Sequence, residues 1–205
     1  RVPVVIGAAT NDTASTVELC KHAEGLGADG LLVVTPYYNK PTQEGLFRHF
    51  EAAARAVKIP IILYNVPGRT GCNMAPETVA RLSALPNIAG VKEAAGDMYQ
   101  VDMLVRLIKK NRPGFSILSG NDDQAFHLVN SGGDGVISVL SNMMPKETSD
   151  IVRLALAGDT AGARALHQRM LPLMKNLFVE ANPIPVKYCV SRLGYCRNEL
   201  RLPLV

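Results

Sequence analysis

The sequence predicts an α/β fold, a TIM (β/α)8-type barrel of which six of the eight strand–helix units are present, followed by C-terminal helices. Three observations predict it. Short β-branched runs recur at a nearly constant interval, each run is apolar throughout instead of alternating, and sequence with helical periodicity lies between the runs. Continuous apolar character is typical of parallel strands that are covered on both faces.

The predicted strands are spaced by roughly 20 to 30 residues, the length of one strand plus one crossover helix. Helix-start residues follow four of the strands, because Asp12, Thr42 and Asp97 can cap a first turn and Pro76 fits within one. The helix after Asp12 is expected to end near Gly27. Two later helices are expected to span 43–57 and 98–110. The predicted strands are residues 2–6, 30–34, 60–66, 88–91, 115–118 and 135–139.

The pattern changes after the sixth strand. Three helices are predicted there, at 146–157, 160–178 and 186–193, with no strand between them. We therefore divide the chain into a partial barrel, 1–143, and a C-terminal helical region, 144–205.

An open doubly wound sheet is the alternative to a barrel. Such sheets bind nucleotides through a glycine-rich turn after the first strand, and the turn from Gly7 to Asn11 lacks that fingerprint. Gly132, Gly133 and Gly135 precede a strand and therefore predict a tight turn, not a phosphate cradle. The barrel is favoured.

Composition excludes several classes of function. The chain has 205 residues, 47% hydrophobic and 20% charged, with a net charge of +4 that is spread along the chain. Neither nucleic acid nor a membrane is implied as a partner. The four cysteines and four histidines lack metal-ligand spacing, and Cys20 is expected to be a small buried residue. No apolar span or secretion signal is recognisable, so we expect a cytoplasmic location.

Lys92 is the first candidate catalytic residue. It stands where the apolar strand 88–91 runs into the short polar segment 93–96. Desolvation disfavours the charged form of an amine, so a lysine at the end of a packed strand can supply a free amine, which attacks ketones. Chemistry in a barrel gathers at the carboxyl ends of the strands, where Lys92 is placed.

The other predicted strand ends carry further polar groups. Because these ends surround one mouth of a barrel, an amine, three phenols, a guanidinium and a glycine turn are expected to converge there. The segments are 35–38, 64–71, 92–93, 119–122 and 137–138.

Three ordered motifs at these strand ends closely resemble the dihydrodipicolinate synthase family, the pyruvate-dependent class I aldolase-like barrels that include N-acetylneuraminate lyase. They are VTPYYNKP at 34–41, YNVPGRTG at 64–71 and GVKEA at 90–94, and the resemblance continues through NPIPVK at 182–187 to Leu202 and Pro203. Nearly the whole chain takes part.

The resemblance implies a reaction without metal or organic cofactor. Lys92 condenses with the keto carbon of pyruvate to form a Schiff base, and loss of a methyl proton gives an enamine. In the synthase the enamine attacks aspartate semialdehyde to give 4-hydroxy-tetrahydrodipicolinate, on the route to diaminopimelate and lysine. A related pyruvate lyase or keto-acid aldolase is the alternative, but Arg69 and the Thr-Gly after it favour the synthase branch.

Roles for further residues follow from the same resemblance. Tyr64 matches a proton-shuttling phenol and Arg69 a residue that holds substrate carboxylate. Tyr38 matches a relay tyrosine inserted into the neighbouring subunit's site, which implies a dimer as catalytic unit and a homo-oligomer that is a dimer of dimers. Each could instead be a packing, surface or loop residue. The residues matching the family's pocket lining are Gly120, Asn121 and the backbone of Ile137.

The sequence departs from the family in two respects. It begins at what resembles the third barrel strand, so the family's Gly-Thr-Thr-Gly-Glu segment has no counterpart, and Schiff-base formation is expected in preference to full turnover. The outer strands are then expected to be exposed edges. A fragment or a truncated, non-catalytic paralogue is therefore a third hypothesis. Ser15 replaces an acidic residue near Asn11 in the family's allosteric pocket, which predicts weak lysine inhibition.

Overall fold

The computed structural model describes residues 2–205, which divide into two compact units. The first unit comprises 2–118 and Ser131–Gly133, and the second comprises Ser119–Asn130 and Asp134–Val205. The strands follow one another in sequence order from β1 to β6, and the pairings from β1 to β4 are parallel. The predicted parallel sheet is confirmed.

The strands agree with the predicted positions and differ at their ends. β4 includes Lys92 and Glu93, two residues that were expected to follow the strand, because both pair in register with β3. β1 begins later and β6 ends earlier than predicted. The observed strands are β1 Val5–Gly7, β2 Gly30–Val34, β3 Ile61–Asn65, β4 Ile88–Glu93, β5 Ser116–Ser119 and β6 Gly135–Val136.

The helices of the first unit begin where the capping residues predicted. Side-chain oxygens of Asp12, Thr42 and Asp97 accept hydrogen bonds from backbone N–H groups in the first turns that follow them. The single helix predicted over 98–110 is interrupted, because a wider π-helical segment, Val105–Lys109, continues from α5. The helices are α1 Thr13–Gly25, α2 Gln43–Ala56, α3 Pro67–Thr70, α4 Pro76–Ser83 and α5 Met98–Leu104.

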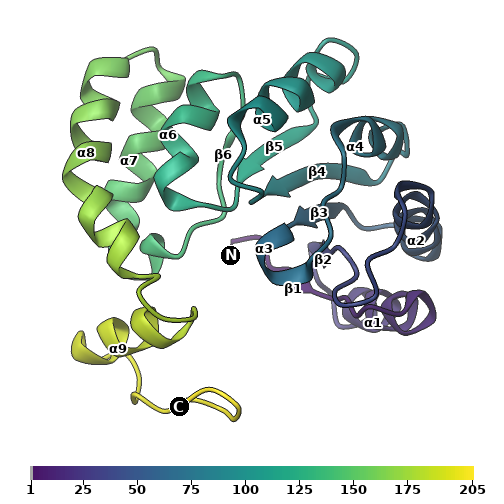
Figure 1. The fold of residues 1–205 in the computed structure, drawn as a ribbon, viewed down its shortest axis with the longest axis horizontal. Helices are drawn as coiled ribbons and strands as arrows, with labels where there is room; N and C mark the ends of the chain where they lie inside the picture. The colour runs from purple at the N-terminus through teal and green to yellow at the C-terminus, as the bar shows by residue number, and fades with distance from the viewer. Residues whose placement is uncertain (1) are drawn as a thin grey trace. The chain divides into compact units, whose positions relative to one another are not determined.

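The core of the first unit lies between the sheet and one layer of helices. Helix α1 contacts α2, α2 contacts α4, and α4 contacts both β4 and α5, as Figure 1 shows. Leu31 and Leu63 are fully buried on the covered face, whereas Leu32 and Ile62, which point the other way, are half-buried. The expectation that both faces are fully covered is therefore met on one face only.

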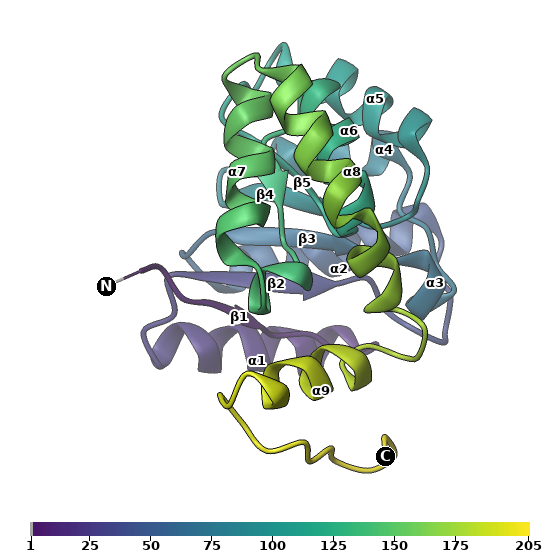
Figure 2. The same ribbon diagram turned by 90° about the vertical axis from the view of Figure 1, so that its left-hand side faces the viewer.

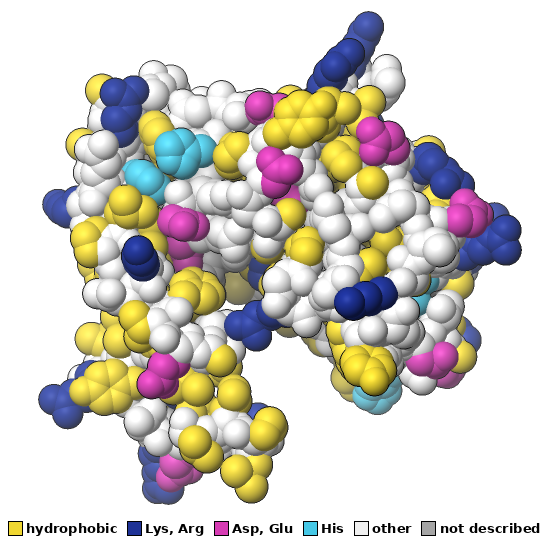
Figure 3. All heavy atoms as spheres, in the orientation of Figure 1, with side chains coloured by type: hydrophobic (Ala, Val, Ile, Leu, Met, Phe, Trp, Pro, Cys, Tyr) yellow, Lys and Arg dark blue, Asp and Glu magenta, His cyan; other side chains and the backbone are white. Residues whose placement is uncertain are grey.

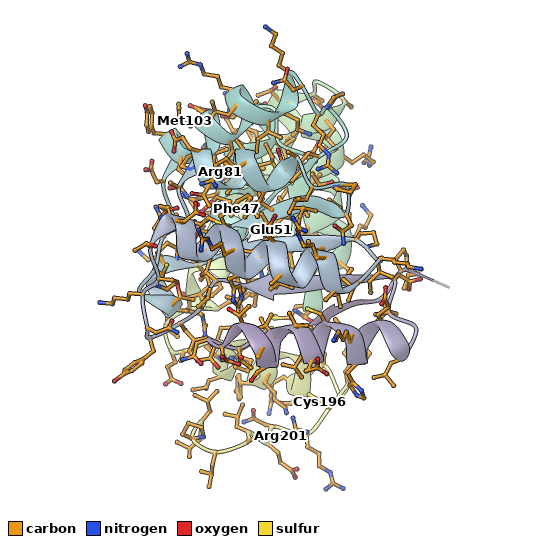
Figure 4. All side chains as sticks on the ribbon, turned by 90° about the vertical axis from the view of Figure 1, so that its right-hand side faces the viewer. Phe47, Glu51, Arg81, Met103, Cys196 and Arg201 are labelled. Atoms are coloured by element: carbon orange, nitrogen blue, oxygen red, sulfur yellow. The ribbon has the colours of Figure 1, made fainter. Side chains whose placement is uncertain are left out.

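The outer side of this helical layer carries exposed ion pairs. Figure 4 shows Phe47 and Glu51 on α2 and Arg81 on α4. The Arg81 guanidinium lies 4.1 Å from the centroid of the Phe47 ring and contacts the Glu44 carboxylate at 3.0 Å. This face is exposed to solvent, and exposed ion pairs of this kind contribute little to stability.

The second unit is mainly helical, as predicted for the end of the chain. Helices α6, α7 and α8 contact one another in pairs and lie side by side in Figure 1, and Figure 2 shows α7 and α8 in front of α6. Its hydrophobic core cluster contains Phe126, Leu140, Ile151, Ala163, Met174, Leu177 and Val186. The helices are α6 Asp122–Asn130, α7 Pro145–Leu156, α8 Thr160–Asn176 and α9 Ile184–Arg192, with a 3-10 turn at Leu140–Asn142.

The surface of the described residues carries charges of both signs, which are interspersed over the face shown in Figure 3. Within residues 2–205 no helix is long and apolar enough to cross a membrane. The same residues contain no cluster of His, Cys, Asp or Glu that could hold a metal ion. Cys20 is buried as predicted, and burial raises the pKa of its thiol to about 11.

Candidate active site

Lys92 and Tyr64 lie next to each other at the carboxyl ends of β4 and β3. The register pairs Tyr64 with Lys92 and Asn65 with Glu93. Because successive side chains of a strand point to opposite faces, Tyr64 and Lys92 share one face of the sheet and Asn65 and Glu93 share the other. The Lys92 Nζ atom lies over the Tyr64 ring, 4.1 Å from its centroid. The structure thus brings together two of the predicted site residues.

A bulge in β4 sets this register. Ile61 pairs with Ile88 but Ile62 pairs with Gly90, so Ala89 is an extra residue in the ladder. A shift of one residue moves every later side chain to the opposite face. The bulge therefore determines which face of the sheet carries Lys92.

Gly90 also permits the close approach of β5 at this point. A Cβ atom at Gly90 would lie 2.5 Å from the Ser116 carbonyl oxygen and 2.9 Å from the Ser116 Cβ atom. Only glycine fits here, two residues before Lys92, without displacing a strand. The GVKEA motif thus contains both the candidate nucleophile and the residue that lets its strand pack.

The Tyr64 phenol occupies a partly buried position next to a positive charge. Burial raises the pKa of Tyr64 above its ordinary value, and the charge of Arg69 acts in the opposite direction. Arg69 belongs to the short helix α3, which begins two residues after β3 ends. At neutral pH the phenol keeps its proton and can donate it. Arg69 is therefore close enough to influence the predicted proton shuttle.

The turn that carries Arg69 is held by Thr70. The Thr70 hydroxyl donates toward the carbonyl oxygens of Val66 and Cys72, at 3.2 and 3.0 Å, and accepts the Cys72 N–H. The buried Thr35 hydroxyl in turn contacts that of Thr70 at 3.4 Å. Both threonine hydroxyls therefore hold the turn that carries Arg69.

Tyr38 extends away from the first unit. Its side chain is 88% exposed, and its φ of 75° lies in the left-handed region that non-glycine residues rarely adopt. Two contacts hold the loop, since the Tyr38 N–H donates to the Thr70 carbonyl and the Asn39 amide donates to the Asn11 carbonyl, at 3.2 and 2.8 Å. The loop is thus built to present a tyrosine outward, and Tyr38 is not packed on its own chain.

Gly120, Asn121 and Ile137 belong to the second unit. The Ile137 N–H donates to the Ser119 carbonyl oxygen at 2.9 Å, which places the end of β6 beside the residue that precedes Gly120. The Asn121 amide donates to Gln124 at 3.0 Å. Within that unit, the three residues therefore cluster around the ends of β5 and β6.

A buried polar network beside the candidate site was not expected from the sequence. Glu93 is 3% exposed, and its carboxylate accepts hydrogen bonds from the Asn65 and Gln100 amides and from the Ala95 N–H. Burial raises the pKa of Glu93, although these hydrogen bonds lower it. No local sequence signal marks it, because the register that pairs Asn65 with Glu93 is set by the pairing of β3 with β4.

Parallel strands followed by helices, with polar residues at their carboxyl ends, define the molecule as part of a TIM-type α/β barrel. The comparisons agree with this class. A crystal structure of dihydrodipicolinate synthase from Thermotoga maritima matches with a TM-score of 0.98 at 52% identity, covering 100% of this chain and 70% of that one. The Acinetobacter baumannii enzyme, crystallised with pyruvate, matches with a TM-score of 0.95 at 44% identity, covering 100% and 69%.

Sequence comparison narrows the class to one family. The model of the dihydrodipicolinate synthetase family matches residues 1–205. The 4-hydroxy-tetrahydrodipicolinate synthase of Kosmotoga olearia is 60% identical over 204 residues, which cover 100% of this chain and 69% of that protein. The chain belongs to the dihydrodipicolinate synthetase family, a family of enzymes, as its motifs predicted.

Proposed function

We propose that this chain carries the Schiff-base half of a 4-hydroxy-tetrahydrodipicolinate synthase, with Lys92 as the nucleophile. The observation that carries the proposal is the position of the Lys92 amine, 4.1 Å from the centre of the Tyr64 ring at the end of β4. The amine attacks the keto carbon of pyruvate, water leaves, and an iminium ion forms. The iminium withdraws electrons, so a methyl proton is lost and an enamine results.

The enamine carbon then forms a bond to the aldehyde carbon of aspartate semialdehyde. The amino group of that substrate attacks the imine carbon and displaces Lys92, which closes the ring of 4-hydroxy-tetrahydrodipicolinate and frees the enzyme. Each step transfers protons and none transfers electrons to an acceptor. No cofactor is therefore needed, and the reaction belongs to lysine and diaminopimelate biosynthesis in the cytoplasm.

Tyr64 and Arg69 assist at the reacting atoms in this proposal. A neutral phenol with a raised pKa donates a proton to the leaving hydroxyl during iminium formation and can recover one afterwards. The Arg69 guanidinium binds a substrate carboxylate, because its planar fork offers two parallel hydrogen bonds. Its positive charge also restrains the rise in the pKa of Tyr64.

Tyr38 and the second-unit residues complete the proposal. The 88% exposed Tyr38 side chain is presented to a second copy of the chain, so the active form is a homo-oligomer whose dimer is the catalytic unit and which assembles as a dimer of dimers. Gly120, Asn121 and the backbone of Ile137 are assigned to substrate binding, as the family resemblance implies. Their small or main-chain groups allow close approach of the substrate.

Borohydride trapping tests the proposal. Incubation with pyruvate and sodium borohydride should reduce the imine to a stable secondary amine, detected as the mass of one pyruvyl adduct per chain. Lys92→Ala should form none. A folded wild-type chain that also forms none would contradict the proposal and favour a non-catalytic family member.

A substrate panel separates the synthase from its relatives. With pyruvate bound, aspartate semialdehyde should discharge the adduct, whereas N-acetylmannosamine and simple aldehydes should not. Discharge by a sugar acceptor alone would assign the chain to a lyase or keto-acid aldolase branch. Because the chain spans 69 to 70% of its relatives' lengths, adduct formation is measured separately from turnover.

A further inference from the structure

The network around Glu93 lies on the sheet face opposite to the reacting groups. The Asn65 amide nitrogen lies 3.1 Å from each Glu93 carboxylate oxygen, and the Gln100 amide nitrogen lies 2.9 Å from one of them. The Ala95 N–H lies 2.7 Å from the other. Every one of these groups is a donor, so the site requires an acceptor with no proton to offer, which is an ionised carboxylate.

The direction of these hydrogen bonds is fixed from outside the network. The side-chain amide oxygen of Asn65, Oδ1, accepts the backbone N–H of Met74 at 3.0 Å, so the side-chain nitrogen of Asn65 must face Glu93. The same nitrogen donates to Asn73 at 2.7 Å, and Asn73 is joined to Gln100 by hydrogen bonds of 2.9 and 3.2 Å. The amide orientations are therefore determined by the backbone, and the carboxylate cannot be replaced by an amide without conflict.

The network joins the strand ends that carry the reacting residues. Asn65 is adjacent to Tyr64 in β3, Glu93 is adjacent to Lys92 in β4, and Gln100 lies in α5 behind them. The strands pair directly here, and the Ala94 N–H donates to the Asn65 carbonyl at 2.9 Å. A rotation or slip of β4 at this point would have to break the buried contacts of Glu93.

We propose that Glu93 is a positioning residue for the reaction at Lys92, because its buried carboxylate, held by Asn65 and Gln100, fixes the end of β4 against β3. The inference rests on the proposed function. Glu93 points away from the substrate side and takes no part in bond making. Its role is to hold the Lys92 amine in line with the keto carbon and beside the Tyr64 phenol. Displacement of a reacting group by about 1 Å can cost about 100-fold in rate.

Glu93→Gln is the primary test variant. The new amide would set a donor against the Asn65 and Gln100 donors, so the end of β4 should shift. We expect the rate constant for adduct formation at saturating pyruvate to fall about 10- to 100-fold, with little change in the pyruvate concentration at half-saturation. Gln100→Met removes one of the donors to Glu93, together with the two hydrogen bonds between Gln100 and Asn73. It should produce a smaller decrease, and it replaces Glu93→Gln as the test if that variant does not fold.

A double variant distinguishes positioning from simple destabilisation. In Asn65→Asp with Glu93→Gln, the donor and acceptor exchange places, and the Asn73 and Gln100 amides can rotate to reverse the hydrogen bonds that join them. One hydrogen bond between residues 65 and 93 and those among residues 65, 73, 93 and 100 are then available again, with Met74 still donating to residue 65, while the 3.5 Å contact from Gln100 to the Met74 carbonyl oxygen is lost. The double variant should trap pyruvate faster than Glu93→Gln alone.

Asn87→Ala is the matched control on the same strand. Asn87 directly precedes β4 and donates to the Ala54 and Val57 carbonyl oxygens, at 2.8 and 3.0 Å. Its loss should lower the free energy of unfolding while leaving the trapping rate unchanged. An equal slowing in Asn87→Ala and Glu93→Gln would show a general stability effect and overturn the inference.

Amide hydrogen exchange provides a readout that does not depend on pyruvate. Exchange at Met74 and Ala94 should accelerate in Glu93→Gln and not in Asn87→Ala. If the wild-type chain traps no pyruvate, the proposed function is wrong. If amide exchange at Met74 and Ala94 is also unchanged in Glu93→Gln, Glu93 does not fix the end of β4 either. If wild type and Glu93→Gln trap pyruvate at the same rate, the proposed function stands and this inference is wrong.

Discussion

The two ends of strand β4 are built differently, although both are rich in polar groups. At the amino end, side chains bond to main-chain carbonyls: Asn87 donates to the oxygens of Ala54 and Val57, and the Arg112 guanidinium donates to that of Leu85 at 2.9 Å. These side chains link neighbouring loops to the start of the strand, and their donors are used in hydrogen bonds to the main chain.

At the carboxyl end, side chains bond mainly to one another. Glu93, Asn65 and Gln100 form a buried network, while Lys92 and Tyr64 remain half-buried on the other face. At the amino end, hydrogen bonds from side chains to the main chain serve stability. At the carboxyl end, the network of buried side chains supports the adjacent Lys92 and Tyr64, which are only half-buried. Barrel enzymes show this division between their two faces in general.

Lys92→Ala gives the largest expected effect on the carboxyl end. Without the amine no imine can form, so trapping of pyruvate should be lost completely. The free energy of unfolding should change little, because Lys92 is only half-buried and lysine and alanine have similar, mildly unfavourable strand propensities. Intact mass measures the adduct and urea denaturation measures stability. A variant that still traps pyruvate to wild-type level would show that another amine reacts.

Tyr64→Phe should separate the two chemical steps at the same end. The ring that lies beside Lys92 is retained, so trapping at long incubation should persist. Proton transfer is impaired, and exchange of the pyruvate methyl hydrogens with deuterium should slow by about 100-fold or more. Proton NMR of the pyruvate methyl signal follows the exchange. Wild-type exchange rates in Tyr64→Phe would remove the phenol from the mechanism.

The pH dependence of that exchange sharpens the account of Tyr64. Burial raises its pKa and Arg69 opposes the rise, so the neutral phenol persists above the ordinary tyrosine value of about 10. The decline in exchange attributable to phenol ionisation should therefore begin above that value. In Arg69→Ala the decline should move to still higher pH, because the opposing charge is gone. A shift to lower pH would contradict the assignment.

Arg112→Ala tests the amino end. The guanidinium donates to the carbonyls of Ser83, Leu85 and Pro86, which lose a partly buried, charged donor in the variant. The free energy of unfolding should fall by about 1 to 3 kcal/mol. Trapping of pyruvate at a temperature where the variant is folded should equal that of wild type. A large loss of trapping would show that the two ends are not functionally distinct.

Thr42→Ala gives the smallest expected effect. The Thr42 hydroxyl accepts the Gly45 N–H at 3.2 Å and caps α2, away from both ends of β4. Its removal should cost about 1 kcal/mol of stability. Thermal denaturation measures the change, with Thr42→Ser as the control that keeps the cap. Equal melting temperatures for the Ala and Ser variants would show that the cap contributes nothing.

The sequence predicted the strands and capped helices well because local signals specify them. Asp12, Thr42 and Asp97 cap the helices as expected, and β2 matches its predicted bounds. The π-helical segment at Val105–Lys109 was missed, since helical periodicity does not distinguish it from an α-helix.

The candidate site was only partly predictable for a similar reason. Motifs identified Lys92 and Tyr64, but their shared face depends on the bulge at Ala89, which no local signal marks. Glu93 was taken for part of a polar segment after the strand, because its partners Asn65 and Gln100 are distant in sequence. Pairwise register between strands, and not residue type, determines this part of the site.

Peptide mapping after borohydride trapping tests the central claim most directly. The wild-type chain is incubated with pyruvate and borohydride, digested, and analysed by tandem mass spectrometry, with Asn87→Ala and Lys92→Ala treated in parallel. We expect one adduct, on Lys92, in wild type and in Asn87→Ala, and none in Lys92→Ala. An adduct on a different lysine, or none in the folded wild-type chain, would contradict the claim that the carboxyl end of β4 performs the chemistry.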